Sequence, residues 1–520
     1  MHLLVISGNL LGMPTGYGTQ SLEMVRGLRR AGHTVSFLTW GLLNPGLAFQ
    51  RITMPHLIET NPTMRKYLTD DDMELFSSDT HVVFHPYETE RTTKRYQDIN
   101  VVIQKHKVDM CILFHDIFVI EPGPLKCPTL VWMPVHFMPL EHRTLMSLQM
   151  CDGIVAMSEY GRDFLSQVLG PDRADILEKR FYHIPHGRPP KVFRPPDSFG
   201  TDAWEDEHVT RKKEMGWPED AFCVLMIASN SEQSNRKAFD AQIQAFARFS
   251  RRMNAEGRKV HGYFHTDGSR AADLPRILEL VGLCPDRSKF IAANDPTGHS
   301  FLKDVDDVSW ASSDGMVSWR ISTHKDVCGF DEPTLIRAYH AADVLLAASC
   351  SEGFGVPIIE AQLCGCPVVT NRTTAMTELT YFGMTCEPAQ FISRNDFVAG
   401  WMQPSSKNVA NALYKIAGWT PETRFARFEE HSEFFTHRYS SEEIGRNWAD
   451  VVGHFGKVMH SLSPHRTFEL DLCRRHSTAV YESEHVNAAL SRAIGRRDAM
   501  EKHRTLAFAM TNTLRGMSAH

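Results

Sequence analysis

The sequence predicts an α/β protein with at least two domains, and three observations support this. The apolar segment 1–6 precedes a glycine-rich loop and a helix at 19–30, which is the opening of a Rossmann-like unit. The segment 222–228 begins a second pattern of buried strand, polar loop and amphipathic helix. Between them, residues 189–217 are rich in proline and charge without sustained periodicity, which is typical of an interdomain connection.

The composition is that of a globular protein. The 520 residues are 42% hydrophobic and 23% charged, enough for two or three domains with their own cores. The first residues show neither a basic region nor a cleavage site, and there is no apolar run of about eighteen residues. We therefore expect a soluble, cytoplasmic protein without a signal sequence or a transmembrane segment. The 11 cysteines include no C-x-x-C pair, so we expect neither structural disulfides nor zinc. A net charge of −6 gives no sign that the whole molecule binds a polyanion.

The most informative stretch is Ser349–Thr370, which reads as a glycine-rich loop, a short helix and a strand. An apolar run of parallel-strand character, 344–348, precedes it. Pro357 suits the first turn of the helix, and Gly365 suits its end. The glycines therefore lie at a strand-to-helix turn, where backbone N–H groups and the helix dipole make a site for a phosphate or diphosphate.

Two glutamates, Glu352 and Glu360, lie within this stretch. They cannot face the same anion, so we expect them to accept hydrogen bonds from neutral hydroxyl groups. A sugar on one side of a diphosphate and a ribose on the other side would offer such groups. The geometry therefore predicts a nucleotide-sugar site.

The same stretch resembles the retaining glycosyltransferases of family 4, the glycosyl transferases group 1. In that family the two glutamates form an E-x7-E element inside S-E-G-F-G-x-P-x-x-E-A-x-x-C-G-x-P-V-V. The resemblance covers most of residues 1–455 and implies a GT-B fold, in which two Rossmann-like domains face each other across a cleft. It also implies a metal-independent, retaining hexosyl- or pentosyltransferase that moves a sugar from a nucleotide diphosphate sugar to an acceptor hydroxyl, with no cofactor besides this donor substrate.

The expected domain boundaries follow from the same comparison of patterns. Residues 1–195 form an N-terminal Rossmann-like domain on the acceptor side, and 196–216 form a linker. Residues 217–440 form the C-terminal Rossmann-like domain that binds the nucleotide sugar. Residues 441–520 form C-terminal helices, and we expect the first of them to cross back to the N-terminal domain.

Arg236 and Lys237 stand at the predicted start of the helix in the second domain. Basic residues are unfavourable at a helix N-terminus unless an anion is bound there, and the resemblance assigns both to the donor diphosphate. It places Glu352 near the donor sugar as a catalytic residue and Glu360 on the ribose. The other donor-binding residues that it implies are Gly16, Gly18, Gly353, Phe354, Gly355 and Val356.

Two predicted strands of the first domain end in histidines. His115 follows the strand 110–114, and His136 follows the strand 129–133. Ligands of open α/β sheets bind beyond the carboxyl ends of the strands, so either histidine contacts a substrate or is satisfied within its loop. Relatives commonly carry an acidic residue near the position of His136, which is retained here as a catalytic candidate. Tyr17 is either a ligand contact or a packed turn residue, and Asp70–Asp72 is interpreted as a solvated acidic turn rather than a metal site.

Several alternatives remain open at this point. A glycosidase would use Glu352 and Glu360 as acid and base, and a non-catalytic subunit would bind the nucleotide sugar only. The acceptor could be a saccharide, a lipid, a protein or a modified base in DNA. The region 285–332, with Trp310 and Trp319, either shapes an acceptor site or lies on the surface, and 461–520 carries nine Lys/Arg against six Asp/Glu. The sequence does not predict the oligomeric state.

Overall fold

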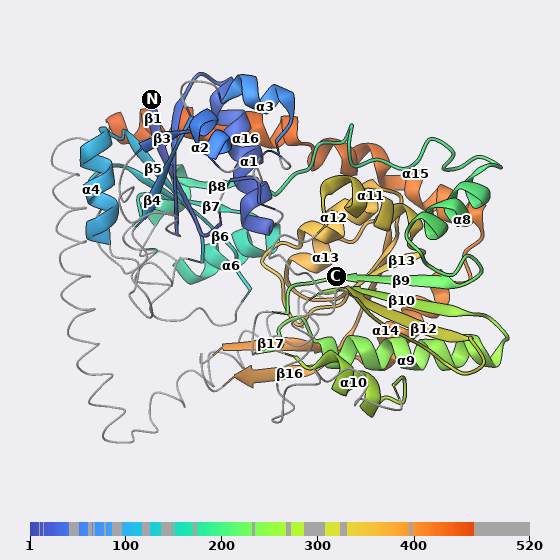
Figure 1. Cartoon of the computed structure of the whole chain (residues 1–520). Coiled ribbons are helices and arrows are strands. Elements are labelled where there is room, and N and C mark those ends of the chain that lie inside the picture. Colours follow the sequence, from blue (N-terminus) through green and yellow to red (C-terminus); the bar gives the residue numbers. More distant parts are fainter. Residues whose placement is uncertain are drawn as a thin grey trace, which may run out of the picture. The chain divides into compact units, whose positions relative to one another are not determined.

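The computed structural model describes residues 1–9, 11–13, 15–40, 51–60, 65, 68–76, 80–85, 96–116, 125–136, 148, 151–169, 174–230, 234–266, 272–284, 307–322, 330–394 and 399–461. The chain divides into two compact units, each built on a mostly parallel sheet (Figure 1). The first unit comprises Met1–Pro185, Ile392–Trp401 and Ile444–His520, and the second comprises His186–Phe391 and Met402–Glu443. The first unit therefore takes up three separate segments of the chain.

The sheet of the first unit has eight strands. They are β1 (His2–Ser7), β2 (Thr34–Trp40), β3 (Arg51–Thr53), β4 (Thr80–His85), β5 (Met110–Phe114), β6 (Thr129–Met133), β7 (Gly153–Ala156) and β8 (Phe181–His183). Their order is β3-β4-β2-β1-β5-β6-β7-β8, and only β3 runs antiparallel to its neighbour. The accompanying helices are α1 (Gly16–Arg30), α2 (Met54–Thr60), α3 (Asp70–Leu75), α4 (Tyr96–His106), α6 (Glu159–Leu169), α7 (Ala174–Lys179) and α16 (Ser441–Ser461).

The apolar strand runs of the sequence become the centre of this sheet. β1 pairs in parallel with β2 and β5, and Leu3–Ile6 are fully buried between them. Strands buried on both faces read as continuous hydrophobic runs, which is why the sequence reveals them. β5 and β6 have the bounds that the sequence predicts.

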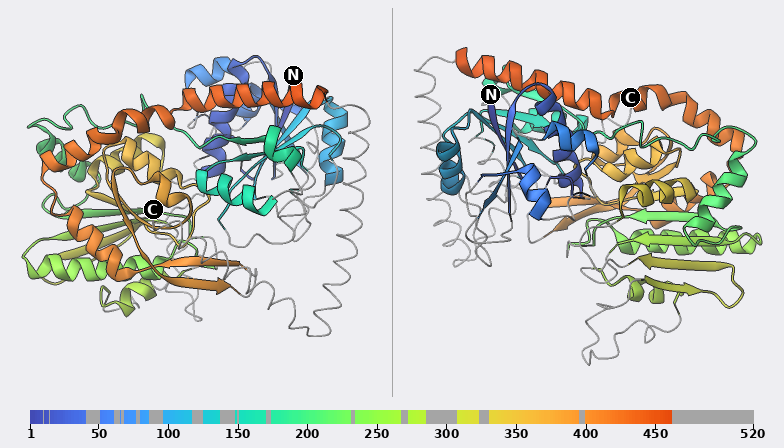
Figure 2. Two further views of the ribbon diagram at one scale, coloured as in Figure 1. Left: turned by 180° about the vertical axis from the view of Figure 1, so that it is seen from behind. Right: turned by 45° about the horizontal axis from the view of Figure 1, so that its top comes forward.

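Helix α16 packs against α1 through a close contact of two glycines. A Cβ atom added to Gly27 of α1 would lie 2.3 Å from the Cα atom of Gly445 in α16. Trp448 of α16 is fully buried and meets the ring of Trp132 edge-on, with the ring centroids 5.0 Å apart. α16 lies beside α1 in both views of Figure 2. From Ile444 onward, the buried residues of α16 therefore belong to the core of the first unit.

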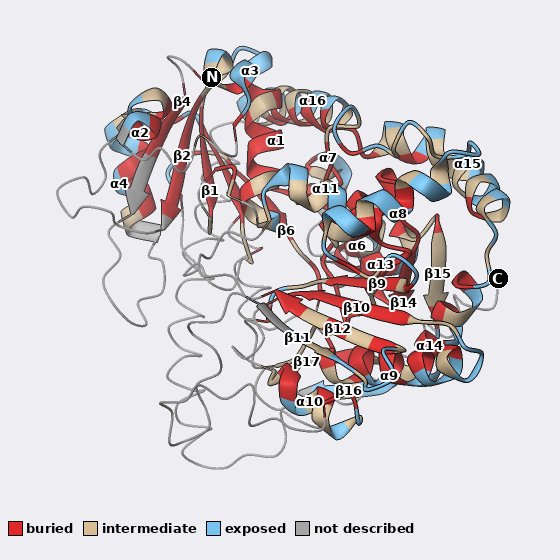
Figure 3. Cartoon of the chain, turned by 45° about the vertical axis from the view of Figure 1, so that its right-hand side comes forward, coloured by how far each residue is buried: buried red, intermediate tan, exposed pale blue. Residues whose placement is uncertain are grey.

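The sheet of the second unit has seven strands in the order β11-β12-β10-β9-β13-β14-β15. The strands β16 and β17 form a separate two-stranded sheet, and each has residues in both units. The strands are β9 (Phe222–Ile227), β10 (Val260–His265), β11 (Asp307–Ala311), β12 (Val317–Ser322), β13 (Val344–Ala347), β14 (Val368–Asn371), β15 (Gly383–Cys386), β16 (Pro388–Arg394) and β17 (Ala399–Pro404). The helices are α8 (Trp204–Glu214), α9 (Phe239–Ala255), α10 (Leu274–Leu280), α11 (Glu332–Ala341), α12 (Val356–Leu363), α13 (Thr374–Leu379), α14 (Ser406–Ile416) and α15 (Pro421–Arg438). Figure 3 shows buried strands under helices whose outer faces are exposed.

A buried carboxylate holds α8 and α15 to the start of β13. The Nζ atom of Lys212 lies 2.8 Å from Asp343 Oδ2, and Arg424 donates to the carbonyl oxygen of Asp343 at 2.8 Å. Burial alone raises the pKa of Asp343, but the charge of Lys212 and the contact with His208 outweigh it and lower the pKa well below its ordinary value. The segment 196–216, predicted as an irregular linker, therefore contains an anchored helix.

Two further expectations need correction. Asp72 is not solvated, because it is buried in the first turn of α3, where Arg26 donates to both of its oxygens at 2.6 Å. Trp319 is not on the surface, because it is fully buried in β12 and donates to the carbonyl of Leu283 at 2.8 Å. Most of the region 285–332 and nearly all of 461–520 lie outside the described residues. No helix of the described part is long and apolar enough to cross a membrane.

We predict that Gly27→Ala lowers the unfolding temperature of the protein. The added methyl group would clash with the backbone of Gly445, and overpacking of this kind costs about 1–3 kcal/mol, enough for a shift of several degrees. The matched control is Gly453→Ala in α16, where a Cβ atom meets nothing within 4 Å. Alanine is the better helix former by up to about 1 kcal/mol, so this control should raise the unfolding temperature. Shifts in the same direction for both variants would contradict the glycine contact.

Candidate functional site

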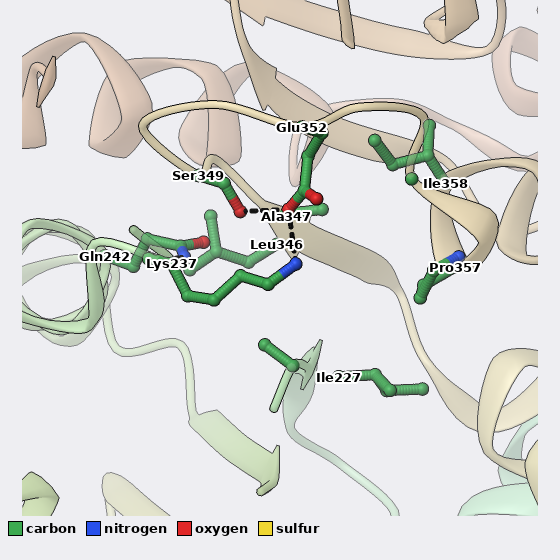
Figure 4. Close-up of a pocket in the computed structure, with 11 residues that line it drawn as sticks. Ile227, Lys237, Gln242, Leu346, Ala347, Ser349, Glu352, Pro357 and Ile358 are labelled. Carbon is green, nitrogen blue, oxygen red and sulfur yellow. Dashed lines mark hydrogen bonds and ion pairs between the residues drawn. The ribbon is translucent and has the colours of Figure 1, made fainter. Parts of the chain in front are cut away.

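The second unit contains a pocket at the carboxyl ends of β9 and β13. The space between the side chains that line it is about 330 Å³, open solvent included. Strand ends and the starts of α9 and α12 converge on it (Figure 4). The lining residues are Ile227, Ala228, Lys237, Gln242, Leu346, Ala347, Ser349, Glu352, Gly355, Pro357 and Ile358. This is the strand-to-helix turn that the sequence predicts as a phosphate site.

The turn into α12 depends on glycine. Gly355 is the N-cap residue and has a φ of 118°, which residues with a Cβ atom rarely adopt. The N-cap makes no side-chain hydrogen bond, and the first turn of α12 carries no acidic residue. The positive end of the helix dipole is therefore not compensated by an acidic side chain of its own first turn. Phe354 is packed rather than exposed, with its ring 4.6 Å from that of His186.

The loop before α9 is held in an unusual conformation. Asn235 and Ala238 both have left-handed φ values, 53° and 49°, and the side chain of Asn235 accepts from the N–H of Phe239 at 3.0 Å. Gln242 donates to the carbonyl of Lys237 at 2.6 Å and accepts from the N–H of Ala348 at 2.9 Å. Gln242 thus joins this loop to the end of β13, a role that the sequence does not reveal.

Four side chains, Arg236, Lys237, Ser349 and Glu352, form what we call the Glu352 cluster. Glu352 Oε1 accepts from Lys237 Nζ at 2.6 Å and from Ser349 Oγ at 2.7 Å. Glu352 Oε2 accepts from Arg236 Nη1 at 3.0 Å, and the same nitrogen donates to the carbonyl of Ser351 at 2.8 Å. In Figure 4 the ammonium of Lys237 and the hydroxyl of Ser349 both point at the carboxylate. The structure therefore brings three predicted catalytic residues together.

The Glu352 cluster carries a net positive charge. Burial alone raises the pKa of Glu352, but the charges of Lys237 and Arg236 and their hydrogen bonds outweigh it and lower the pKa to about 2. With one carboxylate against two cations, the net charge is +2 − 1 = +1. A partly enclosed positive site beside the N-terminus of α12 is suited to an anion. Glu352 stays ionised at neutral pH and cannot act there as a proton donor.

Glu360 has a different environment, although it is only eight residues further along the same motif. Its carboxylate forms an ion pair with Arg188, at 2.9 Å between Nε and Oε1, and accepts from the hydroxyl of Tyr339 at 2.9 Å. Glu360 is buried and is absent from the pocket lining. Burial raises its pKa, which Arg188 and Tyr339 only partly offset. Nothing in the sequence pattern indicates Arg188 as its partner.

In the first unit, the predicted residues gather at the carboxyl ends of β1, β5 and β6. Tyr17, between Gly16 and Gly18 at the start of α1, donates to Asp116 Oδ2 at 2.8 Å. His136 Nδ1 lies 3.9 Å from Asp116 Oδ1. His115 stacks on Tyr17, with ring centroids 5.2 Å apart, and covers Gly8. Asp116 was not predicted as a site residue, although its position just after a buried strand could have indicated it.

No group of three or more histidine, cysteine or acidic side chains among the described residues is arranged to hold a metal ion. The nine cysteines that the structure describes are all buried as thiols.

Residues 313–403 match the family model of the glycosyl transferases group 1. A curated relative, the D-inositol 3-phosphate glycosyltransferase of Saccharomonospora viridis, is 30% identical over 115 residues. This alignment covers 21% of the chain and 23% of the relative, so the chain matches less than a quarter of that protein's length. Both matches rest on part of the chain.

Several solved structures are similar over most of the chain. Sucrose-phosphate synthase from Thermosynechococcus elongatus has a TM-score of 0.53 at 15% identity, covering 89% of this chain and 100% of that one. A glycosyltransferase from Rickettsia africae has a TM-score of 0.52 at 12% identity, covering 89% and 99%. The Anabaena HepE protein in complex with UDP and glucose has a TM-score of 0.51 at 13% identity, covering 87% and 99%. The predicted GT-B fold is thereby confirmed.

We predict opposite pH dependences of stability for Glu352→Gln and Glu360→Gln. The lowered pKa of Glu352 means that its ionised form stabilises the fold above the unfolded pKa near 4.5, and that this contribution is lost as the pH falls toward 2. The raised pKa of Glu360 means that its contribution is present below that range and is lost as the pH rises. Unfolding temperatures of both variants and the native protein, followed from acidic to neutral pH, check this. If the unfolding temperatures of the two variants changed with pH in the same way, the different environments assigned to Glu352 and Glu360 would be wrong.

Proposed function

We propose that this protein of GT-B fold, whose residues 313–403 match the group 1 glycosyl transferases, transfers a sugar from a nucleoside diphosphate sugar to an acceptor hydroxyl. The observation that carries the proposal is the net positive Glu352 cluster beside the N-terminus of α12. A diphosphate supplies the negative charge that this arrangement lacks. Because the structurally similar Anabaena HepE was solved in complex with UDP and glucose, UDP-glucose is the first donor to test.

The proposed reaction uses the cluster to stabilise the leaving group. The bond between the anomeric carbon and the β-phosphate oxygen breaks, and the acceptor hydroxyl bonds to the same face of that carbon. Because this is the face that the phosphate leaves, the configuration is retained, and the acceptor proton passes to an oxygen of the departing phosphate. In this proposal Lys237 and Arg236, both paired with Glu352, neutralise the charge that grows on the diphosphate, which is the task of preorganised donors in a partly buried site. In this proposal the two cations perform that task without a metal ion.

The same geometry argues against a glycosidase. Such an enzyme needs one protonated carboxyl group and one carboxylate flanking the scissile bond in a common site. Glu352 is ionised, with a pKa of about 2, and Glu360 is paired with Arg188 outside the pocket lining. Neither residue is placed for the acid role.

For the acceptor, the polar group at the strand ends of the first unit is the candidate. Asp116 and His136 can hydrogen-bond a hydroxyl group, which suits a saccharide or another alcohol. Trp319 cannot contact a modified DNA base as the acceptor, because this residue is buried in the core. The acceptor can be identified by screening saccharides, lipids and peptides with several nucleotide sugars. The same screen tests the alternative of a non-catalytic subunit, which would bind the donor and form no product.

We predict that Lys237→Ala lowers turnover by about 10²–10³, the usual effect of removing one preorganised donor to a developing charge. The control is Lys213→Ala, which removes a lysine of the same unit whose side chain is 74% exposed. The measurement is the rate of nucleoside diphosphate release at saturating donor for both variants, together with their unfolding temperatures. Turnover of Lys237→Ala close to that of the control, in a folded protein, would refute the role of Lys237 on the diphosphate.

A further inference from the structure

Arg188 and Glu360 form a buried ion pair, and neither residue lines the pocket described above. Arg188 lies in the segment after β8, whereas Glu360 is in the second turn of α12. Both side chains are nearly inaccessible, 5% and 6% exposed. Isolating two charges from water is costly unless they serve each other or a ligand, so this pair needs a reason.

The contacts fix the carboxylate in one orientation. Arg188 Nε forms an ion pair with Oε1, and the hydroxyl of Tyr339 donates a hydrogen bond to Oε2, each at 2.9 Å. An ionised carboxylate has about four acceptor positions, and these two contacts leave others for a ligand. Glu360 also lies four residues after Val356, so both are on the face of α12 that continues from its N-terminus.

Arg188 is itself held independently of Glu360. Its guanidinium lies over the ring of Phe193, 4.1 Å from the centroid, and Nη2 donates to Glu332 at 3.0 Å. Its backbone N–H donates to the carbonyl of Tyr439 at 2.8 Å, and its carbonyl accepts from the N–H of Ser441 at 3.2 Å. These backbone bonds remain when the side chain is changed, so the segment stays anchored in a variant.

We propose that Arg188 is a positioning residue for donor recognition, which holds the buried carboxylate of Glu360 ionised and oriented to accept hydrogen bonds from the ribose hydroxyl groups of the nucleotide. This inference rests on the proposed function, and it concerns the part of the donor that the Glu352 cluster does not touch. The groups facing Glu360 are Arg188, Tyr339 and Glu332, with Cys364 at the C-cap of α12. Arg188 is the cation among these groups and does most to favour the ionised form, and the hydrogen bond from Tyr339 adds to its effect.

The test compares two ligands that differ only in the ribose. UDP and 2′,3′-dideoxyuridine diphosphate are titrated calorimetrically into the native protein and into Arg188→Gln. The native protein should prefer UDP by about tenfold or more, the size expected for hydrogen bonds to a charged group. Arg188→Gln should lose most of this preference while its affinity for the dideoxy ligand changes little. The control Arg194→Gln, which removes an exposed arginine of the same segment, should keep the preference.

A merely structural Arg188 gives a different pattern. In that case Arg188→Gln weakens both ligands by the same factor and the preference for UDP persists, which overturns the inference. The inference also falls if the native protein binds both ligands equally. Arg188→Lys, which keeps the charge but not the Nε contact, should retain more of the preference than Arg188→Gln. If the native protein binds no nucleoside diphosphate, the proposed function fails and this inference fails with it.

The native protein alone provides a second readout should the variant fail to fold. The two ligands carry the same diphosphate, so protonation of its phosphates changes both affinities by the same factor. The pH dependence of the affinity ratio therefore reports on ionisable groups of the protein. The ratio should fall as the pH is lowered through the raised pKa of Glu360, because protonation removes the charged acceptor. In Arg188→Gln the fall should begin at a higher pH. A ratio that does not change with pH would contradict the role of an ionised Glu360.

Discussion

The buried charge of Glu352 determines how the site of the second unit is built. A carboxylate removed from water requires partners, and here they come from two separate loops, one before α9 and one before α12. The loop before α9 holds Asn235 and Ala238 in the left-handed region, which residues with a Cβ atom rarely adopt, whereas the turn into α12 uses Gly355 at its positive φ. The ion pairs, together with the hydrogen bond from the N–H of Cys350 to the carbonyl of Arg236 at 2.8 Å, hold the two helix ends in place.

The buried carboxylate also explains how two cations can lie close together before any ligand arrives. Lys237 and Arg236 would repel each other, and Glu352 between them offsets the repulsion. Under the proposed function, a diphosphate would meet donors that are already oriented, so little reorganisation would be needed when charge develops in the transition state. Glu360 differs from Glu352 because it pairs with one cation, Arg188, while burial disfavours the ionised form of its carboxyl group. Two glutamates of one motif thus differ because of the residues that meet them.

The sequence was sufficient for features that depend on local pattern. Continuous apolar runs identified β5 and β6, and the glycines and proline of the central stretch located the turn into α12. Helix α8 was missed because its exposed residues carry charge all around, and its stability comes from Lys212 reaching Asp343 across the fold. The burial of Asp72 was missed for the same reason, since Arg26 is far from it in the sequence. The roles of Arg188 and Gln242 depend on contacts with residues far away in the sequence, and such contacts cannot be predicted from the spacing within a motif.

A crystal structure of the protein with a nucleoside diphosphate bound would decide whether the Glu352 cluster holds the donor. We expect the β-phosphate to lie beside the N-terminus of α12, with an oxygen about 3 Å from the Nζ atom of Lys237. Glu352 should then remain in contact with Arg236 or Lys237 rather than turn away. A diphosphate bound elsewhere, with Lys237 and Arg236 still engaged only by Glu352, would contradict the assignment of this cluster to the donor.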